Sequence, residues 1–585
     1  MNRLLVLLVA LSLAGGIALP APVLGVGVVS SPHNLSTGAE QRVCIFCHTP
    51  HHATRLSDQL YPGPLWNRDE IVDPFYYTPY ESSTLVATQG KAVTQPQGAS
   101  RICLSCHDGT IALASASHGL AVNLPPLSGS AVLGRDLRYD HPVSVQYGAQ
   151  PSEYQDPAVL NAGKVKLVNR SGVNYVECTS CHDPHDNQYG NFLVLDTSTQ
   201  QDSLCSTCHI PNSWSGSAHQ ADATLSPKGC MNCHATHKAQ QGENLLLIPG
   251  GGSNIDGSCT ASCHNDISGR SVGVFNHGNN SDPAGNKHRG AENLALAATW
   301  GADPLPLGSP EKHVHCVDCH NPHQTGIAPI TPPTPPEVTG VLKGVRGVDI
   351  NGQPRTGATP YAQYEYEICF RCHSGDAALA GDYNAPDPVV RIFNSWDQRE
   401  RFNWGTAKSW HPVGAPFTRV GSSQGLSLKD PGQRIIFCND CHDPHGSTRT
   451  HLLREDNQDT FSPTQGISYP LCYKCHDENY LLTTSGNTRV LRLHKAHVLG
   501  VHQDGNNFKA SCSNCHDPHG VPNKFGLTTE TNSLHLINFD TRYAGVGSSY
   551  DATAGSCFIV AGTSVSCHPT TANPALFSAY DTYSP

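Results

Sequence analysis

The sequence has little of what an ordinary globular core is made from. Of its 585 residues, 38% are hydrophobic, 7% are aromatic and 15% are charged. Soluble domains usually contain about 45–50% apolar residues, and 54 glycines and 43 prolines further limit long helices and strands. Such a chain cannot bury enough of its own surface in the usual way. We therefore expect something other than aliphatic side chains to fill the interior.

Methionine is scarce, and charge is not concentrated anywhere. The two methionines are Met1 and Met231, and the net charge of −11 is spread without a long acidic or basic run. Nucleic-acid binding requires a basic surface that neutralises phosphates. The composition therefore argues against a nucleic acid as a partner.

The one long apolar run lies at the N-terminus. Arg3 is followed by the apolar residues 4–19 and by the small residues around Ala21, a pattern that predicts a signal peptide over residues 1–25. A membrane anchor is the alternative, but glycines and prolines from Gly15 onward interrupt the run. No second run is long enough to span a membrane. We expect an exported mature chain without a membrane span, extracellular or at the cell surface, with the periplasm as the alternative.

Cysteine is abundant, and its spacing is specific. Ten of the twelve cysteine pairs form the motif C-x-x-C-H, which is the attachment signal of a c-type haem. Zinc sites combine two C-x-x-C units and do not need a histidine after each one. The sequence therefore predicts covalent haem at these pairs: Cys44 with Cys47, Cys103 with Cys106, Cys178 with Cys181, Cys205 with Cys208, Cys230 with Cys233, Cys316 with Cys319, Cys369 with Cys372, Cys438 with Cys441, Cys472 with Cys475, and Cys512 with Cys515.

The last four cysteines form two irregular pairs. Cys259 and Cys263 precede His264 in a C-x3-C-H motif, whose thiols still share one face of a helical turn. Cys557 and Cys567, before His568, are too far apart for one turn, and a disulfide loop is the alternative. The order of the repeat favours a haem at both pairs, which brings the expected number to twelve heme c groups.

The motif histidine, called the proximal histidine below, is expected to ligate the iron of its own haem, because two thiols and an imidazole on one helical turn match a haem's vinyl groups and iron. We number the sites 1 to 12 in chain order. The proximal histidines are His48, His107, His182, His209, His234, His264, His320, His373, His442, His476, His516 and His568.

Every second motif continues with another histidine three residues after the proximal one, called the +3 histidine. This strict alternation divides the chain into six dihaem modules, and a proline-rich linker falls inside the fourth. The +3 histidines are His51, His185, His237, His323, His445 and His519. The expected modules are 26–125, 126–212, 213–270, 271–385, 386–482 and 483–585.

Histidine is the expected second axial ligand of each iron, because Met1 leaves with the signal and Met231 lies inside a motif. A +3 histidine cannot reach the far face of its own haem. We expect the +3 histidines from His185 onward to ligate the second haem of their own modules. An upstream histidine would then ligate the first haem of each module: His33, His141, His219, His313, His411 and His497. His315 or His288 could replace His313, and His494 or His502 could replace His497.

Regular secondary structure is expected to be sparse. The sequence predicts a mostly irregular chain with one-turn helices at the motifs, haem groups as its core, and short strands over residues 143–147, 164–168 and 192–195. His118, His277, His451 and His535 are expected at the surface or in contact with haem propionates.

The alternating CHDPH and plain CxxCH motifs, with His-Pro-Val segments at His141 and His411, resemble the doubled-CXXCH multihaem cytochromes. The opening residues 44–53 and 64–68 are similar to secreted cytochromes of metal-reducing bacteria, some of which polymerise into nanowires. This resemblance implies electron transfer through a haem chain, head-to-tail contacts between copies, and redox partner proteins or extracellular acceptors. It also implies that His51 or His52 completes an iron of a neighbouring subunit.

Two other functions remain possible from the sequence. A multihaem reductase of a small nitrogen or sulfur oxyanion needs an iron with an open position, whereas every motif here ends in histidine and spare histidines outnumber the irons. A monomeric periplasmic electron shuttle would share the motifs and differ only in its assembly. We therefore expect an electron carrier rather than an enzyme, with no catalytic residues.

The haem number can be measured directly. Mass spectrometry of the mature protein is expected to show twelve haem additions, because twelve cysteine pairs end in Cys-His. Eleven additions, with Cys557 and Cys567 joined in a disulfide, would contradict the interpretation of the last pair.

Overall fold

A computed structural model describes the chain over these residues: 27–54, 63–68, 73, 75–81, 95–113, 122, 124–148, 154–210, 214–226, 228–240, 243–247, 257–260, 263–264, 315–326, 335–338, 340–356, 361–374, 391–395, 397–415, 428–430, 435–457, 469–482, 489–500, 509–529, 531–551 and 556–560. The predicted signal peptide, most of the proline-rich linker, His118, His277, His288, His313, His502, Cys567 and His568 lie outside them. No helix among the described residues is long and apolar enough to cross a membrane.

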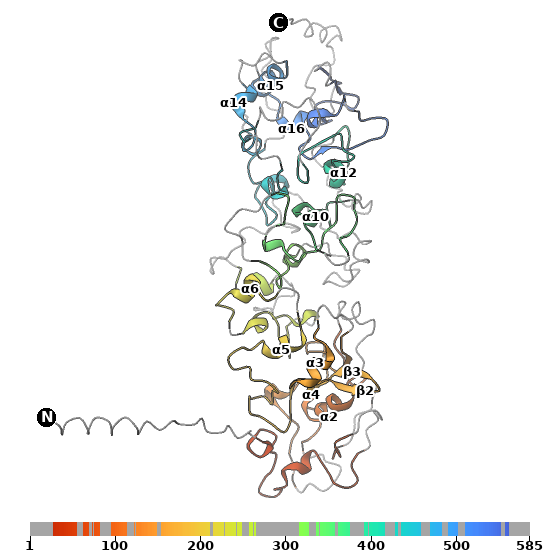
Figure 1. The fold of residues 1–585 in the computed structure, drawn as a ribbon, viewed down its shortest axis with the longest axis vertical. Helices are drawn as coiled ribbons and strands as arrows, with labels where there is room; N and C mark the ends of the chain where they lie inside the picture. Colours follow the sequence, from red (N-terminus) through yellow and green to blue (C-terminus); the bar gives the residue numbers. More distant parts are fainter. Residues whose placement is uncertain are drawn as a thin grey trace, which may run out of the picture. The chain divides into compact units, whose positions relative to one another are not determined.

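The chain divides into two compact units. Unit 1 contains residues 1–210 and 226–246, and unit 2 contains residues 211–225 and 247–585. Both consist mostly of coil with short helices, as the composition predicts (Figure 1).

The elements of unit 1 are short, and its longest helix has ten residues. They are η1 (Val28–Ser30), η2 (Val43–Phe46), α2 (Gly98–His107), η3 (Gly129–Ala131), β1 (Val145–Gln146), α3 (Pro157–Ala162), β2 (Val168–Arg170), β3 (Val173–Val176), α4 (Cys178–Cys181), α5 (Ser203–Cys208), η4 (Gly229–Asn232) and η5 (Glu243–Leu245).

Unit 2 has the same character. Its elements are α6 (Ala218–Ala221), α7 (Gly257–Thr260), α9 (Cys316–Cys319), η6 (Gly340–Leu342), α10 (Glu365–Cys369), α12 (Gln398–Phe402), β4 (Ser409–Trp410), η7 (Cys438–Asp440), η8 (Thr450–Leu452), α13 (Pro470–Tyr473), α14 (Glu478–Leu482), α15 (Arg489–Leu499), α16 (Cys512–Cys515), β5 (Gly520–Val521), η9 (Leu534–Leu536), β6 (Ser549–Asp551) and β7 (Ser556–Phe558).

The sheets are small and antiparallel. Unit 1 holds a three-stranded sheet in the order β1-β3-β2, and unit 2 holds the pairs β4-β5 and β6-β7. A two-residue turn joins β2 to β3, with φ of 49° at Ser171 and 86° at Gly172, a backbone that suits tight hairpins. Strands occur within residues 143–147 and at residue 168. The prediction for 192–195 is wrong, because Asn191 and Phe192 adopt left-handed backbone angles that form a turn.

Apolar packing is confined to small clusters. In unit 1, Tyr77, Leu104 and Leu137 form one cluster, and in unit 2 the largest is built around Tyr366 and Phe370. The described apolar side chains thus form separate patches and not one continuous core. This arrangement is consistent with a cytochrome whose haem groups occupy the interior.

Buried ion pairs hold motif segments to their neighbours. Glu177, directly before α4, is buried, forms an ion pair with Arg170 on β2, and accepts hydrogen bonds from Ser100 on α2 and from Ser144. Burial raises the pKa of Glu177, while the serine hydrogen bonds and Arg170 favour its charged form. One carboxylate therefore joins the segments that carry the second and third motifs.

Replacing Glu177 with alanine is expected to destabilise unit 1. The Arg170 side chain is 4% exposed, and breaking a buried pair costs about 3–5 kcal/mol because the remaining charge has no partner. Thermal unfolding, followed by circular dichroism, should show a melting temperature several degrees below that of wild type. Asp136→Ala is the control, because its ion pair with Arg138 is about half exposed. Equal melting temperatures for both variants would contradict this role of Glu177.

Candidate haem sites

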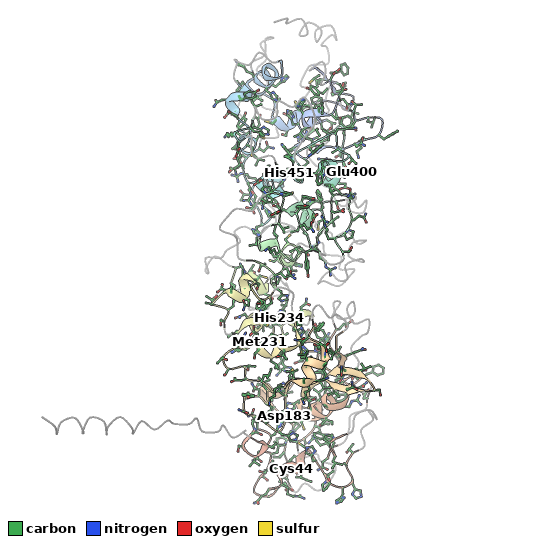
Figure 2. The ribbon with its side chains drawn as sticks, in the orientation of Figure 1. Cys44, Asp183, Met231, His234, Glu400 and His451 are labelled. Carbon is green, nitrogen blue, oxygen red and sulfur yellow. The ribbon has the colours of Figure 1, made fainter. Side chains whose placement is uncertain are left out.

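The motif residues form a single short turn, as the spacing predicts. In the second module, α4 contains both cysteines, and the His182 N–H donates to the Cys178 carbonyl over 3.0 Å. The irregular motif keeps this relation, because the His264 N–H donates to the Cys259 carbonyl over 2.9 Å. The extra residue between Cys259 and Cys263 therefore leaves the proximal histidine of site 6 beside its turn. Figure 2 labels Met231 and His234 of the fifth motif.

At some sites the regular helix is shorter than expected and ends before the second cysteine. At site 5, η4 ends one residue before the exposed Cys233, and at site 8, α10 ends at Cys369, three residues before the half-buried Cys372. The physical reason is a tightened last turn, in which each N–H bonds to the third residue back. The Cys233 N–H donates to the Cys230 carbonyl over 3.1 Å, and the Cys372 N–H donates to the Cys369 carbonyl over 3.2 Å. Both second thiols therefore remain on the turn that precedes the proximal histidine.

Each of seven proximal histidines has its Nδ1 atom hydrogen-bonded to a backbone carbonyl from a later loop. A carbonyl only accepts, so Nδ1 carries the proton and Nε2 is left to bind a metal. The pairs are His48 with Pro64, His107 with Ala131, His182 with Asn191, His234 with Asn244, His320 with Val341, His442 with His451 and His516 with His535.

A repeated turn supplies three of these seven carbonyls. Asn244, His451 and His535 have φ of 58–59°, and each is followed by a leucine that is also left-handed. The next residue forms an isolated bridge with the proximal histidine, as Leu453 does with His442. His451 and His535 thus contribute main-chain acceptors, a role that sequence analysis missed. The signal was the matching Asn-Phe-Leu and His-Leu-Leu tripeptides after the CHDPH motifs.

Nine proximal histidines face a second histidine ring, with 5.9–6.3 Å between the ring centroids. The facing pairs are His48 with His185, His107 with His33, His182 with His237, His209 with His141, His264 with His219, His320 with His445, His442 with His519, His476 with His411 and His516 with His494.

This spacing fits a haem iron between the two rings. Imidazole nitrogens bind zinc at about 2.0–2.1 Å, and a similar bond to iron on each side sets the ring centroids roughly 6 Å apart. The Nδ1 hydrogen bonds direct the proximal Nε2 atoms for this purpose. The residues present therefore fit heme c, with two cysteines and a proximal histidine on one side and a second imidazole opposite.

The rings are paired differently from the sequence-based assignment. His185 faces His48 of the preceding module, whereas His209, its expected partner within the module, faces His141. The same shift recurs at His237, His445 and His519, each of which faces the first site of the module before it.

The upstream histidines are shifted in the complementary way. His33, His141, His219 and His411 face the second site of their own modules and not the first. The last module is the exception, because there an upstream histidine faces the first site, as expected: His494 of α15, the alternative to His497, faces His516.

The residue before the +3 histidine accompanies this shift through its carbonyl. It is a proline in most modules, but before the shifted His237 it is Thr236, whose carbonyl accepts the N–H of His141 over 2.8 Å, so proline is not required. The Pro184 carbonyl accepts a hydrogen bond from Nδ1 of His33 over 3.1 Å, while the next residue, His185, faces His48. The Pro322 carbonyl accepts in the same way from His219, and Pro518 from His411. One Pro-His dipeptide thus reaches both sites of the preceding module, a relation that spacing within a module does not reveal.

At three of these histidines, burial favours the neutral imidazole that a metal ligand must be. Burial lowers the pKa of His476 to about 4 and the pKa values of His516 and His519 to about 3. Nearby histidines, such as His494 beside His516, lower them further.

Cysteines of consecutive sites are neighbours across module boundaries. A hydrogen bond between Cys103 and Cys178 raises the pKa of the first thiol and lowers that of the second. Cys205 and Cys230 make the same contact. In unit 2 it recurs for Cys369 with Cys438 and for Cys472 with Cys512. The first cysteines of two sites therefore meet wherever these modules join.

Within a module, the second cysteines of the two sites are neighbours instead. Burial raises the pKa of Cys181 to about 12, and the nearby Cys208 raises it further. Cys47 and Cys106 have this relation in the first module, and Cys441 and Cys475 in the fifth. Together the contacts link sites 1 to 5 in unit 1, in chain order.

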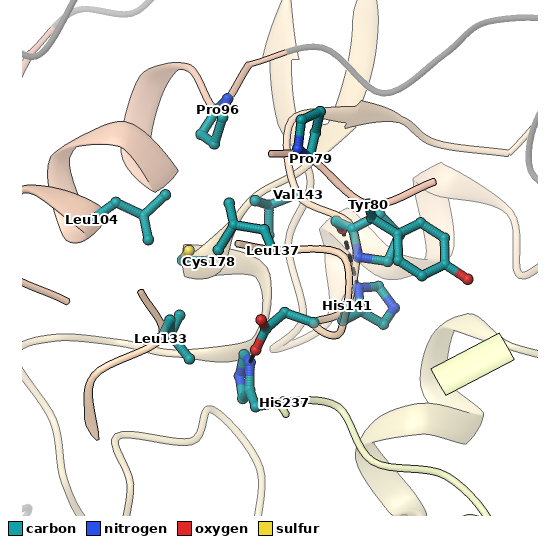
Figure 3. Close-up of a pocket in the computed structure, with 12 residues that line it drawn as sticks. Pro79, Tyr80, Pro96, Leu104, Leu133, Leu137, His141, Val143, Cys178 and His237 are labelled. Carbon is teal, nitrogen blue, oxygen red and sulfur yellow. Dashed lines mark hydrogen bonds and ion pairs between the residues drawn. The ribbon is translucent and has the colours of Figure 1, made fainter. Parts of the chain in front are cut away.

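A small cavity lies beside the third site (Figure 3). It is lined by Cys178 of the motif, by His237 and His141, and by apolar side chains that include Leu104 and Leu137. The lining thus combines an attachment thiol, an axial imidazole and an apolar wall, as a haem requires.

Sites in the first, fourth and last modules are less complete. Cys567, His568 and His313 lie outside the described residues. His51 is exposed, and among the described residues no histidine ring faces it. His323 lies against Trp214, with ring centroids 6.1 Å apart.

Comparison with known proteins agrees with the interpretation of the motifs. The family described as "Doubled CXXCH motif" matches residues 172–213 and 432–480, which hold the motif pairs of the second and fifth modules. No curated protein matches the chain. The doubled motif, together with the paired cysteines and facing imidazoles, supports a multihaem c-type cytochrome with covalently bound heme c.

Proposed function

We propose that the protein conducts electrons along a chain of about twelve bis-histidine haems. The observation that carries this proposal is the order of neighbouring cysteines in unit 1, where a thiol of each site interacts with a thiol of the next site in sequence. The haems supply the redox chemistry when bound. The chain attaches them, orients their ligands and brings consecutive sites together.

The protein's own residues set the conditions for low-potential transfer. Two imidazoles per iron give lower potentials than a methionine ligand does, and Met231 lies between the two cysteines of its own motif. The facing rings at nine sites leave those irons without an open position for a substrate. This favours an electron carrier over an oxyanion reductase, which needs an open position.

Removing one haem from the middle of unit 1 tests the conduction proposal. Cys205→Ser with Cys208→Ser deletes site 4, so current through films of the purified protein should fall to a small part of the wild-type value. The control is Asp136→Ala, which leaves all haems in place. Mass spectrometry must show that the variant loses one haem only. An unchanged current through such a variant would contradict a sequential path.

We further propose that the protein is exported and forms head-to-tail filaments that extend the haem chain outside the cell. Four of the +3 histidines face the first site of the preceding module, and by the same rule the exposed His51, in the first of the six modules, would pair outside them. An iron of a second copy is the available partner. Such a contact is heterologous and propagates as an open helix. A monomeric periplasmic shuttle is the competing proposal.

The double variant His51→Ala, His52→Ala tests this assembly. It should remain a monomer with its full number of haems, because the attachment cysteines are untouched, and show one low-spin site fewer than assembled wild type. Electron microscopy and the oxidised absorption spectrum give the two readouts. Filaments with unchanged spectra would exclude the cross-subunit ligand, and a wild type that never assembles would favour the shuttle.

A further inference from the structure

One axial histidine has a charged and buried hydrogen-bond partner. Nδ1 of His237 lies 3.2 Å from Oδ1 of Asp140, and the same oxygen accepts the backbone N–H of Lys238 over 3.2 Å. The other Nδ1 hydrogen bonds described above end on neutral carbonyls, such as that of Asn191 beside His182. His237 therefore differs from them in the charge of its acceptor.

The surroundings of Asp140 strengthen this contact. Asp140 is 5% exposed and lines the cavity at the third site, together with Leu133, Leu137 and Val143 (Figure 3). Among the described residues, no lysine or arginine side chain forms an ion pair with it. Charges interact more strongly in such an apolar, weakly hydrated setting than at a surface.

We propose that Asp140 is a positioning residue that gives haem 3, the site of Cys178, Cys181 and His182, the lowest reduction potential in unit 1. The proposal rests on the bis-histidine ligation proposed above, because it acts through His237, which faces His182.

The sign follows from the charges. Reduction adds one electron to the iron and removes one positive charge from the site, with no proton required. A carboxylate bonded to the ligand increases the ligand's basicity and stabilises the ferric state more than the ferrous state. Hydrogen bonds to charged acceptors are roughly twice as strong as those to neutral ones. Haem 3 should therefore be the last haem of unit 1 to be reduced.

A second carboxylate provides an internal comparison. Nδ1 of His185 lies 3.4 Å from Oδ1 of Asp183, but these side chains are 65% and 51% exposed. The longer distance and solvent screening weaken the effect there. His185 faces His48, the proximal histidine of haem 1. The reduction potential of haem 1 should therefore be lowered less than that of haem 3.

Potentiometric titration of the haem-loaded protein, followed by absorption and electron paramagnetic resonance, tests the proposal. Asp140→Asn keeps an oxygen acceptor and removes the charge. One haem should then become easier to reduce, with its ferrous-to-ferric ratio at fixed potential rising about five- to tenfold. A tenfold change corresponds to 59 mV for a one-electron couple. The low-spin signal of the same haem should shift. Asp140→Glu should retain the wild-type component, and Asp183→Asn should give the smaller change.

The outcomes are distinguishable. Titration curves of Asp140→Asn that coincide with wild type, with low-spin spectra in both, would overturn the role of Asp140 and leave the proposed function intact. If mass spectrometry shows that Asp140→Asn has lost a haem, the Asp140→Glu variant is used instead. A low-potential component equal to that of wild type then supports the proposal, and loss of that component overturns it. A wild type without low-spin haems would instead remove the proposed function itself.

Discussion

Two imidazoles on one iron must come from different parts of the chain, and this requirement explains much of the structure. The proximal histidine is fixed by its motif turn, so the second imidazole has to be carried in from elsewhere. His185 crosses to His48, and His33 crosses to His107. With a haem iron between the rings, each such pair would cross-link distant segments. A chain with small, separate apolar clusters would thereby acquire long-range order that its aliphatic side chains do not supply.

A single Pro-His dipeptide contacts two sites at once. The Pro184 carbonyl orients one axial histidine while His185 itself faces another proximal ring. Because both sites belong to the preceding module, this dipeptide holds that module together, and Pro518 with His519 does the same for the fifth module. The attachment cysteines of adjoining modules, such as Cys103 and Cys178, are brought together at the same junction. Ligation, module order and proximity of neighbouring sites therefore depend on the same few residues.

The sequence alone predicted the sparse secondary structure and the doubled CXXCH motifs, because both follow from composition and from short motifs. It also placed His141 and His185 among the candidate ligands. It could not predict which proximal histidine each would face, because spacing along the chain does not show which module a later segment packs against. His494 was ranked below His497, since both lie on α15 and periodicity does not separate them. The carbonyls of His451 and Asn191 were missed because every residue has a main-chain carbonyl, so the residue type at a position says little about whether its carbonyl accepts a hydrogen bond.

The cross-module pairing of axial histidines is the central claim, and a density map of the haem-loaded protein tests it most directly. Electron cryo-microscopy at a resolution that shows imidazole rings would identify both ligands of each iron. The account predicts His185 opposite His48, His237 opposite His182, and His141 opposite His209. A map in which His185 instead ligates the haem of Cys205 and Cys208, within its own module, would contradict it.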